Sequence, residues 1–228
     1  MQRNCIVLSA CVLMSALPVA WSAGGGNMPM PHMNAPQATS LEDQAKSAYN
    51  DGVRAVKKAD KYQTSADEQT DAKKKDKDLR EAKEHYSSAL AKFTQAARFD
   101  PRMHEAWNYI GYTNRKLGQY NIALAAYERA LALHPGYPEA LEYRGEAFLA
   151  LNRISDAQQA YLDLFAGNRQ LADKLLTAMR GWVNTQRTSS AGADATAVAA
   201  FDKWVQERAQ IAGQTASLTR TGAASSWR

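Results

Sequence analysis

The stretch HEAWNYIGYTNRKLGQYNIALAAYERALALHPGY, residues 104–137, decides how this chain folds. Its residue types return along the chain at a constant interval of 34 positions, in two sets of three: Ala89, Ala123 and Ala157, and Phe93, Tyr127 and Tyr161. A repeat of this kind is typical of stacked helical hairpins, because one hairpin cannot bury its apolar face alone. The spacing therefore predicts an array of paired helices.

The same stretch indicates how the two helices of one hairpin pack. Gly111 and Ala123 are small, as is required where two antiparallel helices cross closely. Trp107 and Tyr127 lie at helical spacing on the apolar faces and are expected to fill the seam between the helices. Pro135 lacks a backbone N–H and is expected to end the second helix before the next hairpin begins.

Residues 104–137 resemble a tetratricopeptide repeat, because seven of the family's eight signature places are filled as usual, by Trp107, Ile110, Gly111, Ala123, Tyr127, Ala130 and Pro135. The eighth place holds Asn114, where an aromatic residue is usual. Residues 138–171 match less completely, through Leu141, Gly145, Phe148, Ala157 and Tyr161. The resemblance implies an all-α tetratricopeptide-repeat superhelix of about three hairpins.

The first hairpin is predicted to be elongated. Gly52 and Ala89 lie 37 positions apart, whereas Gly111 and Ala123 lie 12 apart, so the first hairpin carries an insertion. We expect its second helix to begin near residues 71–77 and each arm to gain ~18 Å at 1.5 Å per residue. The charged run KKKDKD within the insertion mixes both signs, which favours a solvated arm over a nucleic-acid site. A projection that docks a protein is the remaining alternative.

The sequence predicts five segments: a signal peptide at 1–23, a disordered Met/Pro/Gly-rich linker at 24–40, a repeat array at 41–168, capping helices at 169–211 and a flexible tail at 212–228. The array divides into repeats at 41–103, 104–137 and 138–168. Apolar stripes continue beyond the array and predict two further helices, which would close the stack with a polar outer side.

The first residues are typical of an export signal. Arg3 precedes a short apolar run that Pro18 interrupts, and small residues follow. Cleavage after Ser22 or Ala23 would leave a mature chain without cysteine and without a membrane-inserted segment, whereas an uncleaved anchor is the alternative. We expect a location in the bacterial periplasm or outside the cell.

The sequence favours a protein without catalytic activity or cofactor. It carries none of the fingerprints of hydrolases, P-loop proteins or dinucleotide-binding enzymes. The formal charge of +5 is spread over 228 residues, which does not indicate nucleic-acid binding. A metal hypothesis concerns the thioethers and the imidazole near the mature N-terminus, at Met28, Met30, His32 and Met33, which suit Cu(I). A flexible tether is the alternative.

The resemblance implies a groove lined by the first helix of each hairpin, which would hold a protein or peptide segment of unknown identity. By register, its residues are Asn108, Tyr112, Arg115, Lys116, Glu139, Glu142 and Glu146. Glu139 and Tyr143 stand where relatives that clamp a chaperone tail need Lys and Arg, so a terminal carboxylate is not the expected ligand. We expect Tyr112 and Arg115 to serve binding and not folding. Self-association into a homo-oligomer is the competing hypothesis.

Overall fold

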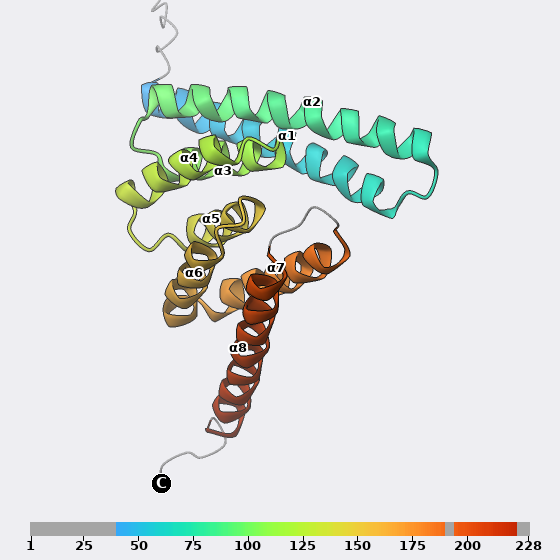
Figure 1. The fold of residues 1–228 in the computed structure, drawn as a ribbon. Coiled ribbons are helices and arrows are strands. Elements are labelled where there is room, and N and C mark those ends of the chain that lie inside the picture. The colour runs from blue at the N-terminus through green and yellow to red at the C-terminus, as the bar shows by residue number, and fades with distance from the viewer. Residues whose placement is uncertain (1–39, 190–193, 223–228) are drawn as a thin grey trace, which may run out of the picture. The chain divides into compact units, whose positions relative to one another are not determined.

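The computed structural model describes residues 40–189 and 194–222, and these residues form eight α-helices (Figure 1). The helices are α1 (Leu41–Glu68), α2 (Ala72–Phe99), α3 (His104–Lys116), α4 (Tyr120–Leu133), α5 (Pro138–Ala150), α6 (Ile154–Gly167), α7 (Arg169–Thr188) and α8 (Ala195–Gly222). The predicted signal peptide, the Met/His tract and the last six residues of the tail lie outside this description.

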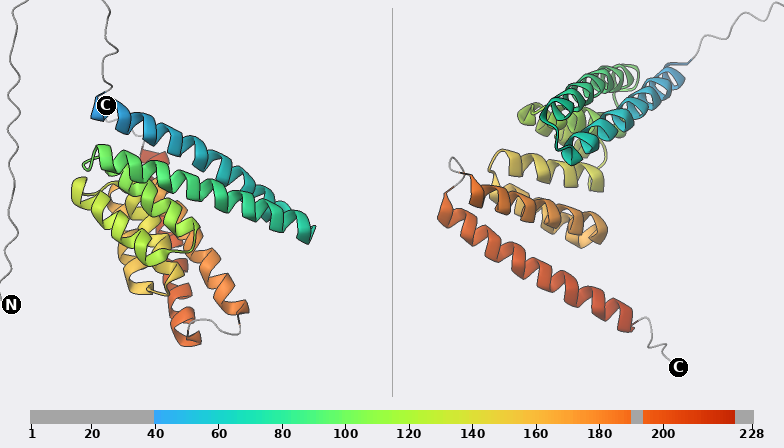
Figure 2. Two further views of the ribbon diagram at one scale, coloured as in Figure 1. Left: turned by 90° about the horizontal axis from the view of Figure 1, so that it is seen from above. Right: turned by 90° about the vertical axis from the view of Figure 1, so that its right-hand side faces the viewer.

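Consecutive helices pair into hairpins, and the pairs stack in chain order (Figure 2). The second helix of each of the first three hairpins buries an aromatic residue completely at the repeated position, namely Phe93, Tyr127 and Tyr161, and α2 buries Tyr86 in addition. The predicted all-α superhelix is confirmed, with α7 and α8 closing the stack.

Glycines on the first helices allow this close pairing. A Cβ atom built on Gly52 would lie 2.7 Å from the ring of Phe93, and one on Gly111 would lie closer still to the ring of Tyr127. Gly145 differs, because its Cβ would meet Leu175 of α7 at 2.6 Å. In the third hairpin the glycine therefore makes room for the next hairpin rather than for its own partner helix.

The first hairpin is elongated as predicted, with 28 residues in each of α1 and α2. At 1.5 Å per residue each helix is about 42 Å long, and the pair reaches well past α3 and α4 (Figure 1). The side chain of Asp71 accepts a hydrogen bond from the backbone N–H of Lys74 and so caps α2. The two helices run close together along the arm because the buried residues at their seam are small, namely Ala59 and Ala66 of α1 and Ala82 of α2.

The C-terminal helices differ from the prediction in one respect. Helix α8 continues to Gly222, whereas we expected a flexible tail from residue 212. The stretch holds no proline before that point, so the helical backbone is not interrupted. Trp182 meets Phe201 edge-on at 5.6 Å, and Trp204 meets Tyr161 at 5.4 Å, so both tryptophans pack inside the stack.

Within the ranges that the structure covers, no helix combines the length and the apolar character that a membrane crossing requires.

Replacing Gly111 by alanine is expected to lower the free energy of unfolding by about 2 kcal/mol, because the new methyl group collides with the ring of Tyr127. Gly181 of α7 is the matched control, since a Cβ there meets nothing within 4 Å. Gly181→Ala should stabilise the protein by about 0.5–1 kcal/mol through helix propensity alone. Urea denaturation followed by circular dichroism measures both, and an equal effect of the two variants would contradict the close approach.

Candidate functional site

Four tyrosines form a continuous row across the first helices of three hairpins. Tyr49 of α1 contacts Tyr109 of α3 with ring centroids 5.7 Å apart, Tyr109 lies 6.1 Å from Tyr112, and Tyr112 lies 5.1 Å from Tyr143 of α5. The Nζ atom of Lys174, on α7, is 5.2 Å from the centre of the Tyr143 ring. We call the face made by α1, α3, α5 and α7 the groove, and these four rings the tyrosine row.

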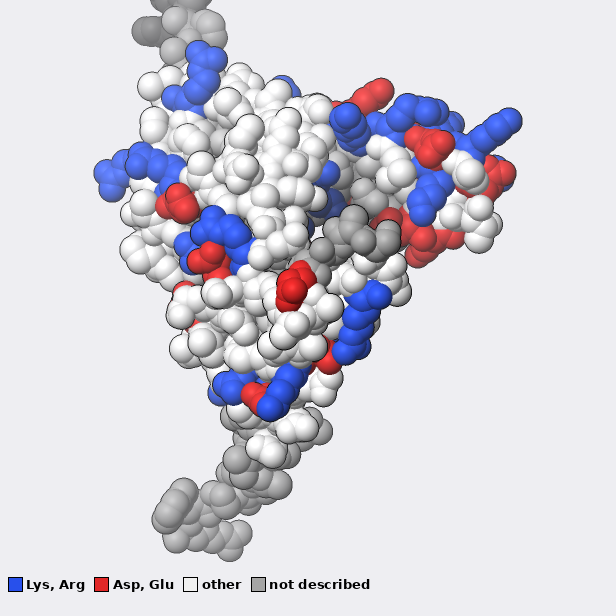
Figure 3. Space-filling view, viewed as in Figure 1, with Lys and Arg blue, Asp and Glu red and all other residues white. Residues whose placement is uncertain are grey.

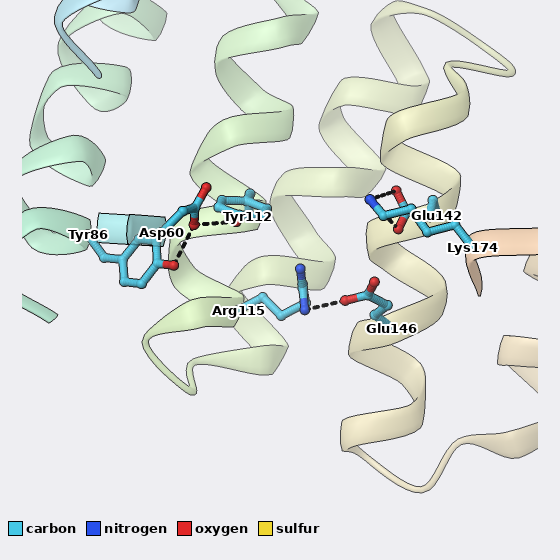
Figure 4. Close-up of polar contacts among 7 residues, drawn as sticks. All are labelled: Asp60, Tyr86, Tyr112, Arg115, Glu142, Glu146 and Lys174. Carbon is cyan, nitrogen blue, oxygen red and sulfur yellow. Dashed lines mark hydrogen bonds and ion pairs between the residues drawn. The ribbon is translucent and has the colours of Figure 1, made fainter. Parts of the chain in front are cut away.

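A carboxylate on the long arm anchors the row to the first hairpin. The Oδ1 atom of Asp60 accepts a hydrogen bond of 2.6 Å from the hydroxyl of Tyr86 and one of 2.7 Å from that of Tyr112 (Figure 4). Burial raises the pKa of both phenols, and their hydrogen bonds to this carboxylate raise it further. The two bonds join α1, α2 and α3, because each helix supplies one of the three residues.

An ion pair joins the second and third hairpins. Arg115 of α3 pairs with Glu146 of α5 (Figure 4). The guanidinium carbon also lies 5.4 Å from the ring centre of Tyr112 and 5.5 Å from that of Tyr143. Only 16% of the arginine side chain is exposed, so this pair is less screened by water than one on an open surface.

A second ion pair joins the third hairpin to α7. The Nζ atom of Lys174 lies 3.0 Å from Oε1 of Glu142 and donates a 3.1 Å hydrogen bond to Oε2 (Figure 4). Glu142 is completely buried. Burial raises the pKa of Glu142 to about 7, and the nearby Glu146 carboxylate adds to this, while the ammonium group of Lys174 opposes it.

Two of the predicted groove residues are buried, which corrects the expectation that they line an open surface. Asn108 and Glu142 occupy the same place in successive repeats, and their exposed fractions are 1% and 0%. At this place the first helices of neighbouring hairpins lie side by side, as the contact of Glu142 with Lys174 of α7 demonstrates. The Oδ1 atom of Asn108 is buried without a hydrogen-bond partner. Neither residue is available to a ligand unless the hairpins separate.

The other predicted groove residues are partly accessible. Tyr112, Arg115 and Glu146 come together as described above. Lys116 is half-buried, with its Nζ atom 5.5 Å from the ring centre of Tyr86. Glu139 is half-buried in the first turn of α5.

Tyr112 and Arg115 also hold the fold together, which differs from the expectation that they serve binding alone. The ring and hydroxyl of Tyr112 contact residues of three other helices, α1, α2 and α5, and Arg115 bridges α3 and α5. Replacing both by alanine would therefore loosen the stack as well as change the groove, so other positions are needed to test binding.

Asp60 and Lys174 were not among the residues expected at this face from the sequence. Asp60 continues the four-residue spacing of Gly52 and Val56 along the buried stripe of α1, and an acidic residue on such a stripe was a usable signal. Lys174 gave no comparable signal. Asn168 is both the C-cap of α6 and the N-cap of α7, so the turn before α7 is short and the 34-residue interval does not carry over to this helix.

Two histidines at helix ends contact each other. His104 begins α3 and His134 follows α4, with their rings stacked at 4.7 Å. Residues 40–189 and 194–222 contain no group of three His, Cys, Asp or Glu side chains that could hold a metal ion. The candidate Cu(I) tract lies outside these ranges.

Comparison with known families supports the interpretation of the repeat. Residues 104–137 match the family model described as tetratricopeptide repeat. The fold is a tetratricopeptide-repeat superhelix. Among solved structures, the chain is similar to the first tetratricopeptide-repeat domain of Spaghetti (RPAP3), determined with the HSP90 peptide SRMEEVD. The TM-score is 0.40 and the identity 18%, over 58% of this chain and 93% of that chain.

Asp60→Ala is expected to lower the free energy of unfolding by about 2–3 kcal/mol, because two buried phenols lose a charged acceptor. Asp60→Asn keeps an Oδ1 acceptor and should lose less. Asp67→Ala, at an exposed position of the same helix, should change stability by less than about 0.5 kcal/mol. Thermal denaturation of the three variants is the measurement, and equal losses at both positions would argue against the network.

The Glu142–Lys174 pair predicts a pH dependence. The folded-state pKa of Glu142, about 7, lies above its ordinary value of 4.5, so folding favours the protonated acid. This contribution is fully present below about pH 4.5 and is lost as the pH rises through 7, by up to about 3 kcal/mol. Glu142→Gln cannot ionise, so it should gain stability relative to the wild type between pH 5 and pH 8. If instead the wild type became more stable relative to the variant as the pH rises over this range, the ion pair with Lys174 would outweigh the cost of burying the Glu142 carboxylate.

Proposed function

We propose that this protein is a non-enzymatic scaffold that holds a segment of a partner protein in its groove. The observation that carries the proposal is the tyrosine row, which presents aromatic rings and charged groups from the first helices of successive hairpins on one face. Aromatic residues and arginine dominate the binding energy of protein interfaces. The face is hollowed below the long arm, with Lys or Arg side chains at its back (Figure 3).

The shape and chemistry of the groove favour a polypeptide over a small molecule. The row extends across several helices, so it suits an extended or helical segment that places side chains at intervals along its length. Both signs of charge occur there, with Arg115 and Lys116 on α3 and Glu139 and Glu146 on α5. Mixed charge of this kind selects a partner and its direction rather than supplying affinity alone.

We further propose that the protein acts in the bacterial cell envelope, after export. This part rests on residues 1–23, whose basic start, short apolar run and small-residue end are typical of a cleaved signal.

End-to-end self-association is less well supported. The outer side of α8 carries the exposed charges of Lys203 and Glu207, and that of α1 carries Lys46, Arg54 and Lys57. A stack that continued into a second copy would bury these charges, which is unfavourable unless each finds a partner.

Photo-crosslinking in intact bacterial cells tests the proposal. A photoreactive amino acid at Lys116 or Glu139, in the groove, should link the protein to a partner polypeptide. The same group at Glu128 of α4 or Lys203 of α8, both exposed outside the groove, should give no such product. Mass spectrometry then identifies the linked segment.

The two parts of the proposal are tested separately, binding by crosslinking and export by cell fractionation. Products from Glu128 or Lys203 but not from Lys116 or Glu139 would place binding outside the groove, and the absence of products from all four positions would make the arm the next candidate. Recovery of the protein from the periplasmic fraction with its N-terminus at Ala23 or Gly24 is the expected outcome for export. A chain that keeps residue 1 in the cytoplasmic fraction would contradict that part only.

A further inference from the structure

One end of the groove combines aromatic rings with carboxylates. Tyr49 and Tyr109 meet edge-on at 5.7 Å, and Tyr137 stands at the turn into α5 as its N-cap. Glu105 lies in the first turn of α3 and Glu139 in the first turn of α5. We call these five residues the acidic end of the groove. All five are partly exposed, so none is sealed inside the stack.

The electrostatics of the acidic end are consistently negative. Burial raises the pKa of Tyr49 and of Tyr137, and the carboxylates of Glu105 and Glu139 raise both further. Geometry agrees: Glu139 follows Tyr137 by two residues at the start of α5, and Glu105 adjoins His104, whose ring meets that of Tyr137 edge-on at 4.8 Å. The charged side chains that act most strongly on these two hydroxyls are all acidic.

The opposite end of the tyrosine row differs in charge. There Arg115 lowers the pKa of Tyr112 and of Tyr143, against the stronger effects of burial and nearby carboxylates that raise it. Arg115 is paired with Glu146, and Lys174 with Glu142. Cations of the protein itself thus balance the acids at that end.

The carboxylates of the acidic end lack such cations. Within the ranges that the structure covers, Glu139 makes no ion pair, and the partner of Glu105 is His104, which carries a charge only when protonated. Both glutamates lie at helix N-termini, where the helix dipole offers about half a positive charge. Because each carboxylate carries a full negative charge, a negative potential remains.

We propose that the acidic end of the groove binds a lysine or arginine side chain of the partner segment. The face of a tyrosine ring attracts a cation through its quadrupole, and a carboxylate beside it adds an ion pair. An acidic or phosphorylated side chain would instead meet the carboxylates of Glu105 and Glu139, neither of which is paired with a Lys or Arg of the described residues. This inference rests on the proposed function and adds the chemistry of the bound segment and the place of its basic residue, at the N-terminal ends of α3 and α5.

Binding to a positional-scanning library of dodecapeptides tests the inference with the full mature chain. Lys and Arg should be enriched at one position of the peptides that bind. A selected peptide is then compared with its norleucine analogue, which keeps the methylene chain of lysine and loses the charge. The wild-type protein should bind the lysine peptide roughly 5- to 30-fold more tightly.

Matched variants locate the effect. Glu139→Gln keeps the shape of the side chain and should bring the lysine-to-norleucine ratio close to one, and Glu105→Gln should reduce it. Glu128→Gln, on the exposed side of α4, should leave the ratio unchanged. Circular dichroism checks that each variant stays folded, and the wild-type ratio should fall as salt rises.

The outcomes separate this inference from the proposed function. Peptides that bind the groove without any preference for Lys or Arg would overturn the cation site and leave the scaffold function standing. A ratio that persists in both the Glu139→Gln and Glu105→Gln variants would also overturn it. Failure of the wild-type protein to bind any peptide would overturn both proposals.

Discussion

The close approach of an aromatic ring to a glycine backbone is the contact on which the stack depends. Phe93 and Tyr127 lie against Gly52 and Gly111 at distances that leave no room for a methyl group. The aromatic ring thereby fills the seam completely, and the two helices of a hairpin cross near their minimum separation. Buried apolar residues of neighbouring hairpins then pack into shared clusters, so the stack continues. In the third hairpin the corresponding glycine, Gly145, lies instead against the side chain of Leu175 of α7.

The inserted arm changes what the groove can contain. In a hairpin of ordinary length, the first helix would end before the position of Asp60. The longer α1 carries this carboxylate to the hydroxyl of Tyr112, a residue 52 positions later in the chain. The arm is therefore tied to the second hairpin by a charged hydrogen-bond acceptor, and its base forms one wall of the groove. The distal part of the arm, beyond α3, carries the dense mixed charge visible in Figure 3.

Polar contacts between hairpins and binding chemistry share the same face. Ion pairs join Arg115 of α3 to Glu146 of α5 and Lys174 of α7 to Glu142 of α5. These side chains therefore orient successive hairpins and are not free to bind a ligand. The Arg115–Glu146 pair is largely shielded from water, so removing either residue would leave the other charge without compensation. The acidic end lacks this internal compensation, and for that reason it is the part of the groove whose chemistry points outward to a partner.

The sequence by itself determined the hairpin array, the elongated first hairpin and the residues of the repeat seam. These features follow from spacing along single helices, which side-chain periodicity records directly. It did not determine which groove positions stay open: Asn108 and Glu142 match the register of a binding surface and are nevertheless buried. Their burial depends on how far neighbouring hairpins are offset, and that offset is set by turn lengths and by packing between helices distant in sequence. The contacts of Asp60 and Lys174 arise in the same way, so only the tertiary structure decided which charges are satisfied within the protein and which remain for a partner.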